Sequence, residues 1–225
     1  MLAIIQARMS SRRFPGKMLV DVGGDSLLGK VIKRVLSCES VTRVVVATSN
    51  ETSDDALCEA AHRMGIEYFR GSLSDVAGRL INCGLTYNAE VFIRVNGDSP
   101  LICPSLLDEG CRLFARCAET VDIVTNVMPR TFPRGQSVEV IRTDALERGY
   151  KDFFKNEHFE HVTPYFYAHP EHFRIENFSS GHSMGDIQLS VDTLADLQAV
   201  EVILQHAGGD VSWKTAATLK QEMCG

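Results

Sequence analysis

The sequence predicts an α/β fold with a mostly parallel sheet and helices on both faces. Short runs rich in β-branched residues alternate with helical patterns over roughly the first 125 residues, in the order β-α-β-α-β-α-β-α-β. The run 43–48 is apolar almost throughout, as in strands buried on both faces. Polar loops follow four of the expected strands. Right-handed crossovers place such loops along one edge of the sheet, so we expect a ligand site there.

The first half of the chain divides into alternating strands and helices. The expected strands begin at Leu2 and cover 43–48, 66–69, 90–95 and 121–125. Asp25 is expected to cap a helix over 26–38, where apolar residues recur at helical spacing. A second helix carries Asp54 and Asp55 in its first turn and stops near Gly65. Helices over 74–87 and 104–117 follow, the latter with Pro104 in its first turn.

The pattern changes after Asn126. Alternation predicts a strand over 137–142, and further strands are expected at 173–178 and 187–191. The expected helices cover 144–154, 157–168, 193–206 and 212–223. No linker separates these segments from the first half. The chain is therefore predicted to form one domain, 1–225, with a substrate-side or dimerisation arm at about 127–186.

Composition limits the function classes. With 225 residues and a formal net charge of −6, the chain lacks the basic balance of a general nucleic-acid binder. A local basic site for a small anion remains compatible with that charge. No window of 18 uninterrupted apolar residues predicts a membrane span, and the N-terminus lacks a signal-peptide layout. These features predict a cytoplasmic protein.

Seven cysteines are scattered through the chain without metal-type spacing. They are Cys38, Cys58, Cys83, Cys103, Cys111, Cys117 and Cys224. Most fall within apolar or helical patterns, which predicts buried free thiols in a reducing compartment.

The loop after the first strand is the most distinctive stretch. Within ten residues it holds four cations, two hydroxyls and a Pro-Gly turn: Arg8, Arg12, Arg13, Lys17, Ser10, Ser11 and Pro15-Gly16. Backbone N–H groups and cationic side chains at a strand end suit a polyanion such as a phosphate chain. The loop is not a Walker A motif, because Met18 follows Lys17 and no glycine stands five residues before Gly16. A solvated basic turn is the alternative interpretation.

Two aspartates are candidate metal ligands. Asp98 follows a strand within Asn96-Gly-Asp-Ser-Pro100, and Asp192 lies beyond the apolar segment 187–191. Mg²⁺ commonly takes one or two carboxylates together with phosphate oxygens, so these two would suffice. The competing interpretation of each is a turn or helix-capping residue.

Other polar residues are less specific. Arg134 and Glu139 flank an expected loop-to-strand junction, where they could contact an acidic or polyhydroxy substrate or form a solvated salt bridge. His158 and His161 share a helical face, but their spacing and the lack of a third ligand argue against zinc. No Ser-His-Asp or Cys-His arrangement can be assigned from the sequence.

An ordered set of motifs gives a family resemblance over about residues 2–205. The motifs are 4–17 (IIQARMSSRRFPGK), 46–49 (VATS), 69–72 (FRGS) with Asp75, 96–102 (NGDSPLI), 130–135 (RTFPRG), 138–140 (VEV), 160–165 (EHVTPY) and 191–193 (VDT). Together they resemble the spore coat polysaccharide biosynthesis cytidylyltransferase-like family. That family is similar to the CMP-sugar-acid synthetases that activate 3-deoxy-manno-octulosonate and acylneuraminate.

The resemblance implies a Rossmann-like nucleotidyltransferase fold and assigns roles to named positions. It implies four catalytic residues: Asp98 and Asp192 hold Mg²⁺, and Arg8 and Lys17 contact phosphate oxygens. It implies nucleotide contacts at Ala7, Arg8, Met9, Ser10, Lys17, Thr48, Arg70, Ser72, Asp75 and Asn96. It implies sugar contacts at Arg134, Gln136, Glu139, His161 and Gln188. It also implies a homodimer whose arm contacts the partner.

Four departures from the family pattern accompany this resemblance. Phe14 replaces a usual Leu and Cys103 a common Asp, whereas Gln136-Ser137 replace Leu-Asp and Gln188 replaces an Arg. The last two lie on the expected acceptor side.

The resulting hypothesis is transfer of CMP from CTP, or from another NTP, to a sugar acid or related sugar with release of pyrophosphate. Such a product would serve surface polysaccharide or glycan synthesis. One alternative is a nucleotide-sugar-dependent glycosyltransferase, although no Asp-x-Asp triplet occurs near Asp98. The other alternative is a nucleotide-binding subunit without turnover.

Overall fold

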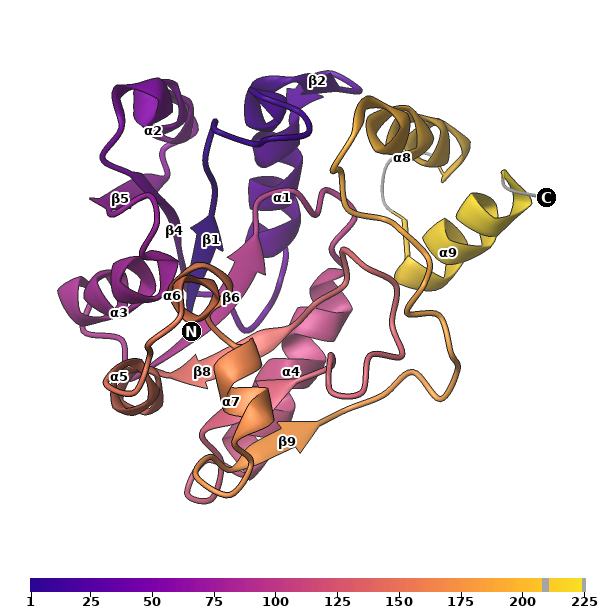
Figure 1. Cartoon of the computed structure of the whole chain (residues 1–225). Helices are drawn as coiled ribbons and strands as arrows, with labels where there is room; N and C mark the ends of the chain where they lie inside the picture. Colours follow the sequence, from indigo (N-terminus) through magenta and orange to yellow (C-terminus); the bar gives the residue numbers. More distant parts are fainter. Residues whose placement is uncertain (208–210, 224–225) are drawn as a thin grey trace.

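The core of the protein is one seven-stranded sheet (Figure 1). The computed structural model describes residues 1–207 and 211–223. Across the sheet the strands are β5 (Glu67–Gly71), β4 (Arg43–Ser49), β1 (Leu2–Gln6), β6 (Val91–Asn96), β8 (Glu139–Arg142), β7 (Ile123–Thr125) and β9 (Ile175–Asn177). β8 pairs antiparallel with β6 and β7, and every other pair is parallel. The mostly parallel sheet predicted from the sequence is therefore confirmed, with β8 as an antiparallel insertion.

Helices cover both faces of the sheet, as predicted. One face carries α1 (Leu27–Leu36), α2 (Asp55–Arg63), α4 (Pro104–Arg116), α8 (Leu194–Ala207) and α9 (Trp213–Glu222). The other carries α3 (Val76–Thr86), α5 (Thr143–Tyr150), α6 (Asn156–His161) and α7 (Pro164–Ala168). Among the described residues, no helix has the length and apolar character needed to cross a membrane.

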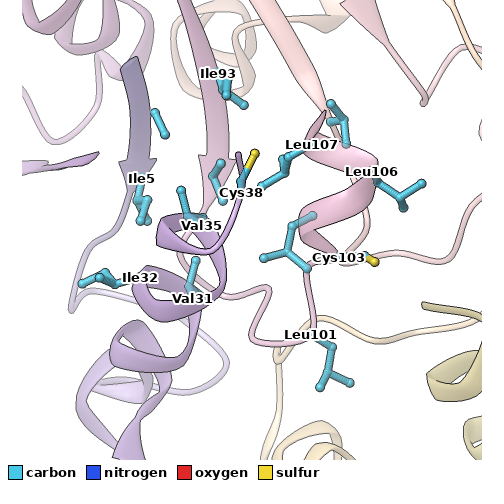
Figure 2. Close-up of a cluster of buried hydrophobic side chains, with 14 of the residues drawn as sticks. Ile5, Val31, Ile32, Val35, Cys38, Ile93, Leu101, Cys103, Leu106 and Leu107 are labelled. Carbon is cyan, nitrogen blue, oxygen red and sulfur yellow. The ribbon is translucent and has the colours of Figure 1, made fainter. Parts of the chain in front are cut away.

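Neighbouring residues of β1 divide between the two hydrophobic cores, because successive side chains of a strand point to opposite faces. Ile5 packs with the α1 and α4 side, whereas Ile4 packs with the α3 and α7 side. Figure 2 shows the first core, where Ile5 and Ile93 from the sheet meet side chains of α1 and α4. Both isoleucines are fully buried. Burial of a side chain of this size stabilises the fold by roughly 1.5–3 kcal/mol.

The helix start near residue 26 differs from the prediction. Ser26, rather than Asp25, caps α1: its hydroxyl accepts a hydrogen bond from the N–H of Gly29 at 3.0 Å. Asp25 instead pairs with Lys30 and Lys33, and these partners lower its pKa. A small hairpin, β2 (Asp21–Val22) and β3 (Asp25–Ser26), precedes the helix and was not anticipated.

The second half departs further from the expected elements. The helix expected over 157–168 is split into α6 and α7, because Val162 has a φ of 70° and Pro164 opens the next helix. The strand expected over 187–191 is absent. That segment has one bridge, between Arg134 and Gln188, and its backbone hydrogen-bonds to loops instead. β8 and β9 nevertheless join the common sheet.

Cysteines in the described residues are free thiols, as predicted. Burial raises the pKa of Cys38 and of Cys83 to about 12, so both are protonated at neutral pH. Cys224 lies outside the described residues.

Candidate functional site

A cavity of about 530 Å³ opens at the carboxyl ends of β1 and β6. Its walls come from the loop after β1, the loop after β6, the start of α3, the end of α6 and Asp192. A cavity therefore lies at the sheet edge where a ligand site is predicted. Six cationic side chains line it against three carboxylates, although the whole chain is acidic. Such a local excess of positive charge in a concave site attracts and holds anions.

Lys17 is buried at the cavity by the turn that precedes it. Gly16 has a φ of 77°, a conformation that side chains other than glycine rarely adopt. The N–H of Gly16 donates to the carbonyl of Met9, which closes the loop, and Lys17 begins the 3₁₀ turn η1 (Lys17–Leu19). The Lys17 side chain is only 6% exposed. The Pro-Gly turn in the sequence thus aims one ammonium group inward.

The Lys17 ammonium joins the two candidate metal carboxylates. Its Nζ donates to Oδ2 of Asp98 at 2.9 Å, to the carbonyl of Val191 at 2.6 Å and to Oδ1 of Asp192 at 3.4 Å. Arg13 contacts the same oxygen of Asp192 at 2.8 Å. Asp98 and Asp192 therefore face one cation, although they are 94 positions apart in the sequence.

The backbone around Asp98 and Asp192 leaves both carboxylates available for a ligand. The helix cap expected of Asp192 is supplied by Thr193, whose hydroxyl accepts the N–H of Asp196, while Oδ2 of Asp196 accepts the N–H of Thr193. The turn before Asp98 is held close to β1, because a Cβ on Gly97 would lie 2.9 Å from the carbonyl of Gln6. Side chains of both aspartates keep about a quarter of their surface exposed.

Asp98 and Asp192 fit a divalent cation in chemical terms. Both offer carboxylate oxygens, which Mg²⁺ prefers, and they already flank a positive charge. No group of three or more His, Cys, Asp or Glu ligands is found within the described ranges 1–207 and 211–223. A cation at this position would therefore complete its coordination with ligand or water oxygens.

The loop after β1 is fastened by a buried aspartate. Oδ1 of Asp54 accepts the N–H of Met9 at 2.8 Å, and Oδ2 accepts the hydroxyls of Thr48 and Ser49. Burial alone raises the pKa of Asp54, but the hydrogen bonds from Ser49, Met9 and Thr48 outweigh it and the net pKa is lowered. Thr48 and Met9, both predicted nucleotide contacts, thus support the loop, and neither is part of the cavity wall. Ser10 is exposed and also lies outside the wall.

An ion pair crosses from this loop to α6. The Arg8 guanidinium contacts Oε1 of Glu160 at 2.8 Å, with both side chains more than a third exposed. The hydrogen bond from Arg8 lowers the pKa of Glu160. His161 lines the same cavity, as do Ala7 and Asn96. His158 turns away and packs against Phe153, Phe154 and Tyr165.

Three further predicted nucleotide contacts lie outside the wall. Arg70 donates to the carbonyls of Ser49 and Glu51 and pairs with Asp55 at 2.5 Å. The hydroxyl of Ser72 accepts the N–H of Asp75. Asp75 caps α3 through the N–H of Gly78 and accepts the hydroxyl of Tyr150, which raises the pKa of that tyrosine to about 12. In this structure all three shape the backbone beside the cavity.

Two of the five expected acceptor residues are built into the scaffold. Gln136 is fully buried; its amide N–H donates to the carbonyl of Leu101 and its amide oxygen accepts the N–H of Cys103. Its role as a sugar contact stays a prediction. Glu139 is buried in an ion pair with Arg94 at 2.8 Å and accepts the Tyr167 hydroxyl. Neither residue is part of the cavity wall.

Arg134 and Gln188 also lie outside the cavity wall, and Arg134 is exposed. The amide of Gln188 donates to Oδ2 of Asp192 at 3.3 Å, so it supports a metal-ligand candidate.

Two buried arginines in the cavity wall were missed. Arg94, in β6, donates to Oε1 of Gln6 and to the hydroxyl of Thr163 besides its pair with Glu139. Arg79, in α3, donates to the carbonyl of Ser72. A charge inside an apolar strand pattern (Val91-Phe-Ile-Arg-Val95) was the available signal for the first. The second sits on the buried stripe of a helix, where Leu80 and Cys83 are also buried.

The chain is similar to several known proteins and matches one family model. A family model described as "Cytidylyltransferase" matches residues 2–211. The spore coat polysaccharide biosynthesis protein SpsF of Bacillus subtilis is 30% identical over 230 residues, covering 97% of this chain and 92% of that protein. A 3-deoxy-manno-octulosonate cytidylyltransferase of Geobacter sulfurreducens is 31% identical over 184 residues, covering 80% and 69%. A solved cytidylyltransferase structure from Leptospira borgpetersenii has 30% identity, a TM-score of 0.89 and coverages of 99% and 92%.

Proposed function

The chain belongs to the cytidylyltransferase family and is a CTP-dependent nucleotidyltransferase, and we propose that its acceptor is a sugar acid and its product a CMP-sugar. One observation supports the proposed position of the reaction in the structure. The Lys17 ammonium, Asp98 and Asp192 converge at a cavity with an excess of cationic side chains. A triphosphate needs such charge, and its α-phosphate would lie beside the two carboxylates through a shared metal ion.

The proposed reaction displaces pyrophosphate in one in-line step. The oxygen of an acceptor hydroxyl attacks the α-phosphorus, the bond from that phosphorus to the bridging oxygen of the β-phosphate breaks, and the hydroxyl proton passes to solvent. Little covalent chemistry is asked of the protein, so positioning and charge stabilisation carry catalysis. Lys17 is aligned by its three oxygen partners, and Arg8 and Arg13 stand on the same loop. These groups would stabilise negative charge on the phosphate oxygens.

Asp98 and Asp192 would hold Mg²⁺, which supplies charge neutralisation at the phosphates and lowers the pKa of the attacking hydroxyl when bound. Their present contact with Lys17 supports this assignment, because the pair already accommodates one positive charge. Gln188 donates to the far oxygen of Asp192 and would fix the direction of that carboxylate.

A sugar acid suits the charge of the cavity. After Asp98 and Asp192 are assigned to the metal, Glu160 is the only carboxylate left among the described wall residues, and it is paired with Arg8. Arg94 and His161 also face the cavity. A carboxylate on the acceptor would add the negative charge that these side chains favour. The Geobacter relative, whose name specifies a sugar acid, supports the same class.

Pyrophosphate release tests the proposal. The protein is mixed with Mg²⁺, one of the four NTPs and one acceptor from a panel of sugar acids, neutral sugars and sugar phosphates. We expect release with CTP and a sugar acid, together with a CMP-sugar of the expected mass. Release with neutral sugars or sugar phosphates alone would refute the acceptor class. Nucleotide binding without release from any acceptor would favour a subunit without turnover.

The same proposal includes a homodimer and a role in polysaccharide synthesis. The segment 127–186 carries Phe154, which is 74% exposed and thus available for contact with another chain. Light scattering after size exclusion, with Phe154→Ser as the variant, tests the assembly: we expect a dimer that weakens in the variant. A monomer at micromolar concentration would refute it.

A further inference from the structure

Arg79 is the most unusual polar side chain in the cavity wall. It lies in α3 and is 3% exposed. Its Nη1 donates to the carbonyl of Ser72 at 2.6 Å. Its Nε is buried and has no hydrogen-bond partner within the described residues. No carboxylate in that part of the chain forms an ion pair with it within 4.0 Å, in contrast to buried Arg94.

A buried arginine with an unpaired donor destabilises the protein unless a ligand accepts a hydrogen bond from it. Removing a donor from water without a partner costs about 1–3 kcal/mol. Burial lowers the pKa of Arg79 to about 10, partly offset by Asp54 and Asp75 and reinforced by the nearby charge of Arg8. The guanidinium therefore stays positive at neutral pH. A purely structural arginine would be expected to have a carboxylate partner, as Arg94 has in Glu139.

The position of Arg79 indicates which part of the nucleotide would reach it. Lys17, Asp98 and Asp192 mark the phosphate end of the cavity. Asp192 lies just before α8, whereas Arg79 lies in α3, on the other side of β1 and β6 (Figure 1). Val76, one turn before Arg79 in the same helix, adds an apolar side chain to that end of the wall. An apolar surface beside one unpaired donor suits a flat ring that carries a carbonyl oxygen.

We infer that Arg79 binds the base of the nucleotide, with its guanidinium donating to a carbonyl oxygen of the pyrimidine ring. This inference rests on the proposed function for the position of the phosphates. It assigns to Arg79 a binding role that the chain's phosphate and metal residues do not fill. Gly71 supports the placement, because a Cβ at this position would lie 2.8 Å from Cγ of Arg79. The absence of a side chain there lets the arginine stem lie flat against β5.

The test compares two ligands that share phosphates but differ in the base. Calorimetry measures binding of CTP and of inorganic tripolyphosphate, each with Mg²⁺, to the wild type, Arg79→Met and Arg79→Lys. Arg112→Met, at an exposed arginine of α4, is the matched control. Thermal unfolding of each ligand-free protein reports folding. Methionine keeps the apolar stem, and lysine keeps the charge without the planar guanidinium.

We expect Arg79→Met to weaken CTP binding roughly tenfold to a hundredfold, the range for a hydrogen bond from a charged donor. Tripolyphosphate binding should change less than twofold, and Arg79→Lys should restore little of the CTP affinity. Ligand-free Arg79→Met should melt close to the wild-type temperature, because removal of an unpaired buried donor offsets loss of the hydrogen bond to the carbonyl of Ser72. Equal losses for both ligands, or no loss for CTP, would overturn the inference. If wild type binds tripolyphosphate but not CTP, the proposed function itself fails.

Discussion

The two sides of the cavity are built differently. On the nucleotide side, the loops after β1 and β6 send Arg8, Lys17 and Asp98 directly into the cavity. On the acceptor side, Gln136 and Glu139 from the segment around β8 are buried in scaffold contacts. These nucleotide-side residues therefore present charged groups to the cavity, whereas Gln136 and Glu139 use their polar atoms in hydrogen bonds and an ion pair with the scaffold.

Strand direction explains the difference. β1, β4, β5 and β6 are parallel, so their carboxyl ends and following loops meet at one edge. β8 runs the opposite way, and the stretch 187–191 is held by a single bridge and by hydrogen bonds to loops. The common edge fixes where nucleotide residues go, but irregular segments give the acceptor residues no equivalent constraint.

The largest expected effect is at Asp98. Asp98→Asn should lower the rate of pyrophosphate release at least about a hundredfold, because a metal ion contributes several kcal/mol to charge stabilisation in the transition state. The unfolding midpoint should change little, since the carboxylate is partly exposed. Asp186→Asn, at an exposed carboxylate, is the control. Near-normal turnover in Asp98→Asn would remove this residue from the metal site.

Gln136 should behave in the opposite way. Gln136→Ala leaves the buried N–H of Cys103 and carbonyl of Leu101 without their partners, so the free energy of unfolding should fall by about 2–4 kcal/mol. CTP affinity should stay within about twofold. Urea unfolding and calorimetry measure the two quantities, with exposed Gln221→Ala as the control. A stable variant with a raised KM for the acceptor would show that Gln136 contacts the sugar after all.

A smaller effect is expected at Glu160. Its partly exposed pair with Arg8 is worth about 0–1 kcal/mol, so Glu160→Gln should free Arg8 for phosphate and raise CTP affinity by up to about fivefold. Glu157→Gln, in the same helix, should leave the affinity unchanged. Weaker CTP binding in Glu160→Gln would instead show that Glu160 holds Arg8 in the binding position.

The same pair predicts the smallest effect, a dependence of stability on acid. Arg8 lowers the pKa of Glu160, so the stability it contributes is present above the ordinary value of 4.5 and is lost as pH falls through the lower folded value. Between wild type and Glu160→Gln, the difference in unfolding midpoint should therefore vanish in strong acid. Thermal unfolding from pH 7 downward measures it. A difference that grows on acidification would contradict the pairing.

Local sequence patterns predicted much of the fold and part of the candidate site. The cations of the first loop and the two aspartates follow apolar segments, and topology brings Lys17, Asp98 and Asp192 together. Thr48 also follows a strand, but the sequence could not show that its hydroxyl would bond Asp54.

The positions of the remaining site residues could not be predicted, because they depend on contacts between distant parts of the sequence. Arg94 and Glu139 are 45 positions apart and meet only because β8 inserts antiparallel beside β6. Arg79 lies in a helix interior, where an arginine normally indicates a solvated face. Only the packing of α3 beside the cavity shows that this arginine is buried.

Binding of CTP without any acceptor tests the division between the two sides most directly. Calorimetry with Mg²⁺ compares wild type, Lys17→Met on the nucleotide side and Arg134→Ala on the acceptor side. We predict that wild type and Arg134→Ala bind CTP equally, within about twofold, while Lys17→Met, which loses a charge-assisted phosphate contact, binds at least about tenfold more weakly. If Arg134→Ala weakens CTP binding as much as Lys17→Met, or if Lys17→Met binds like wild type, the division is wrong.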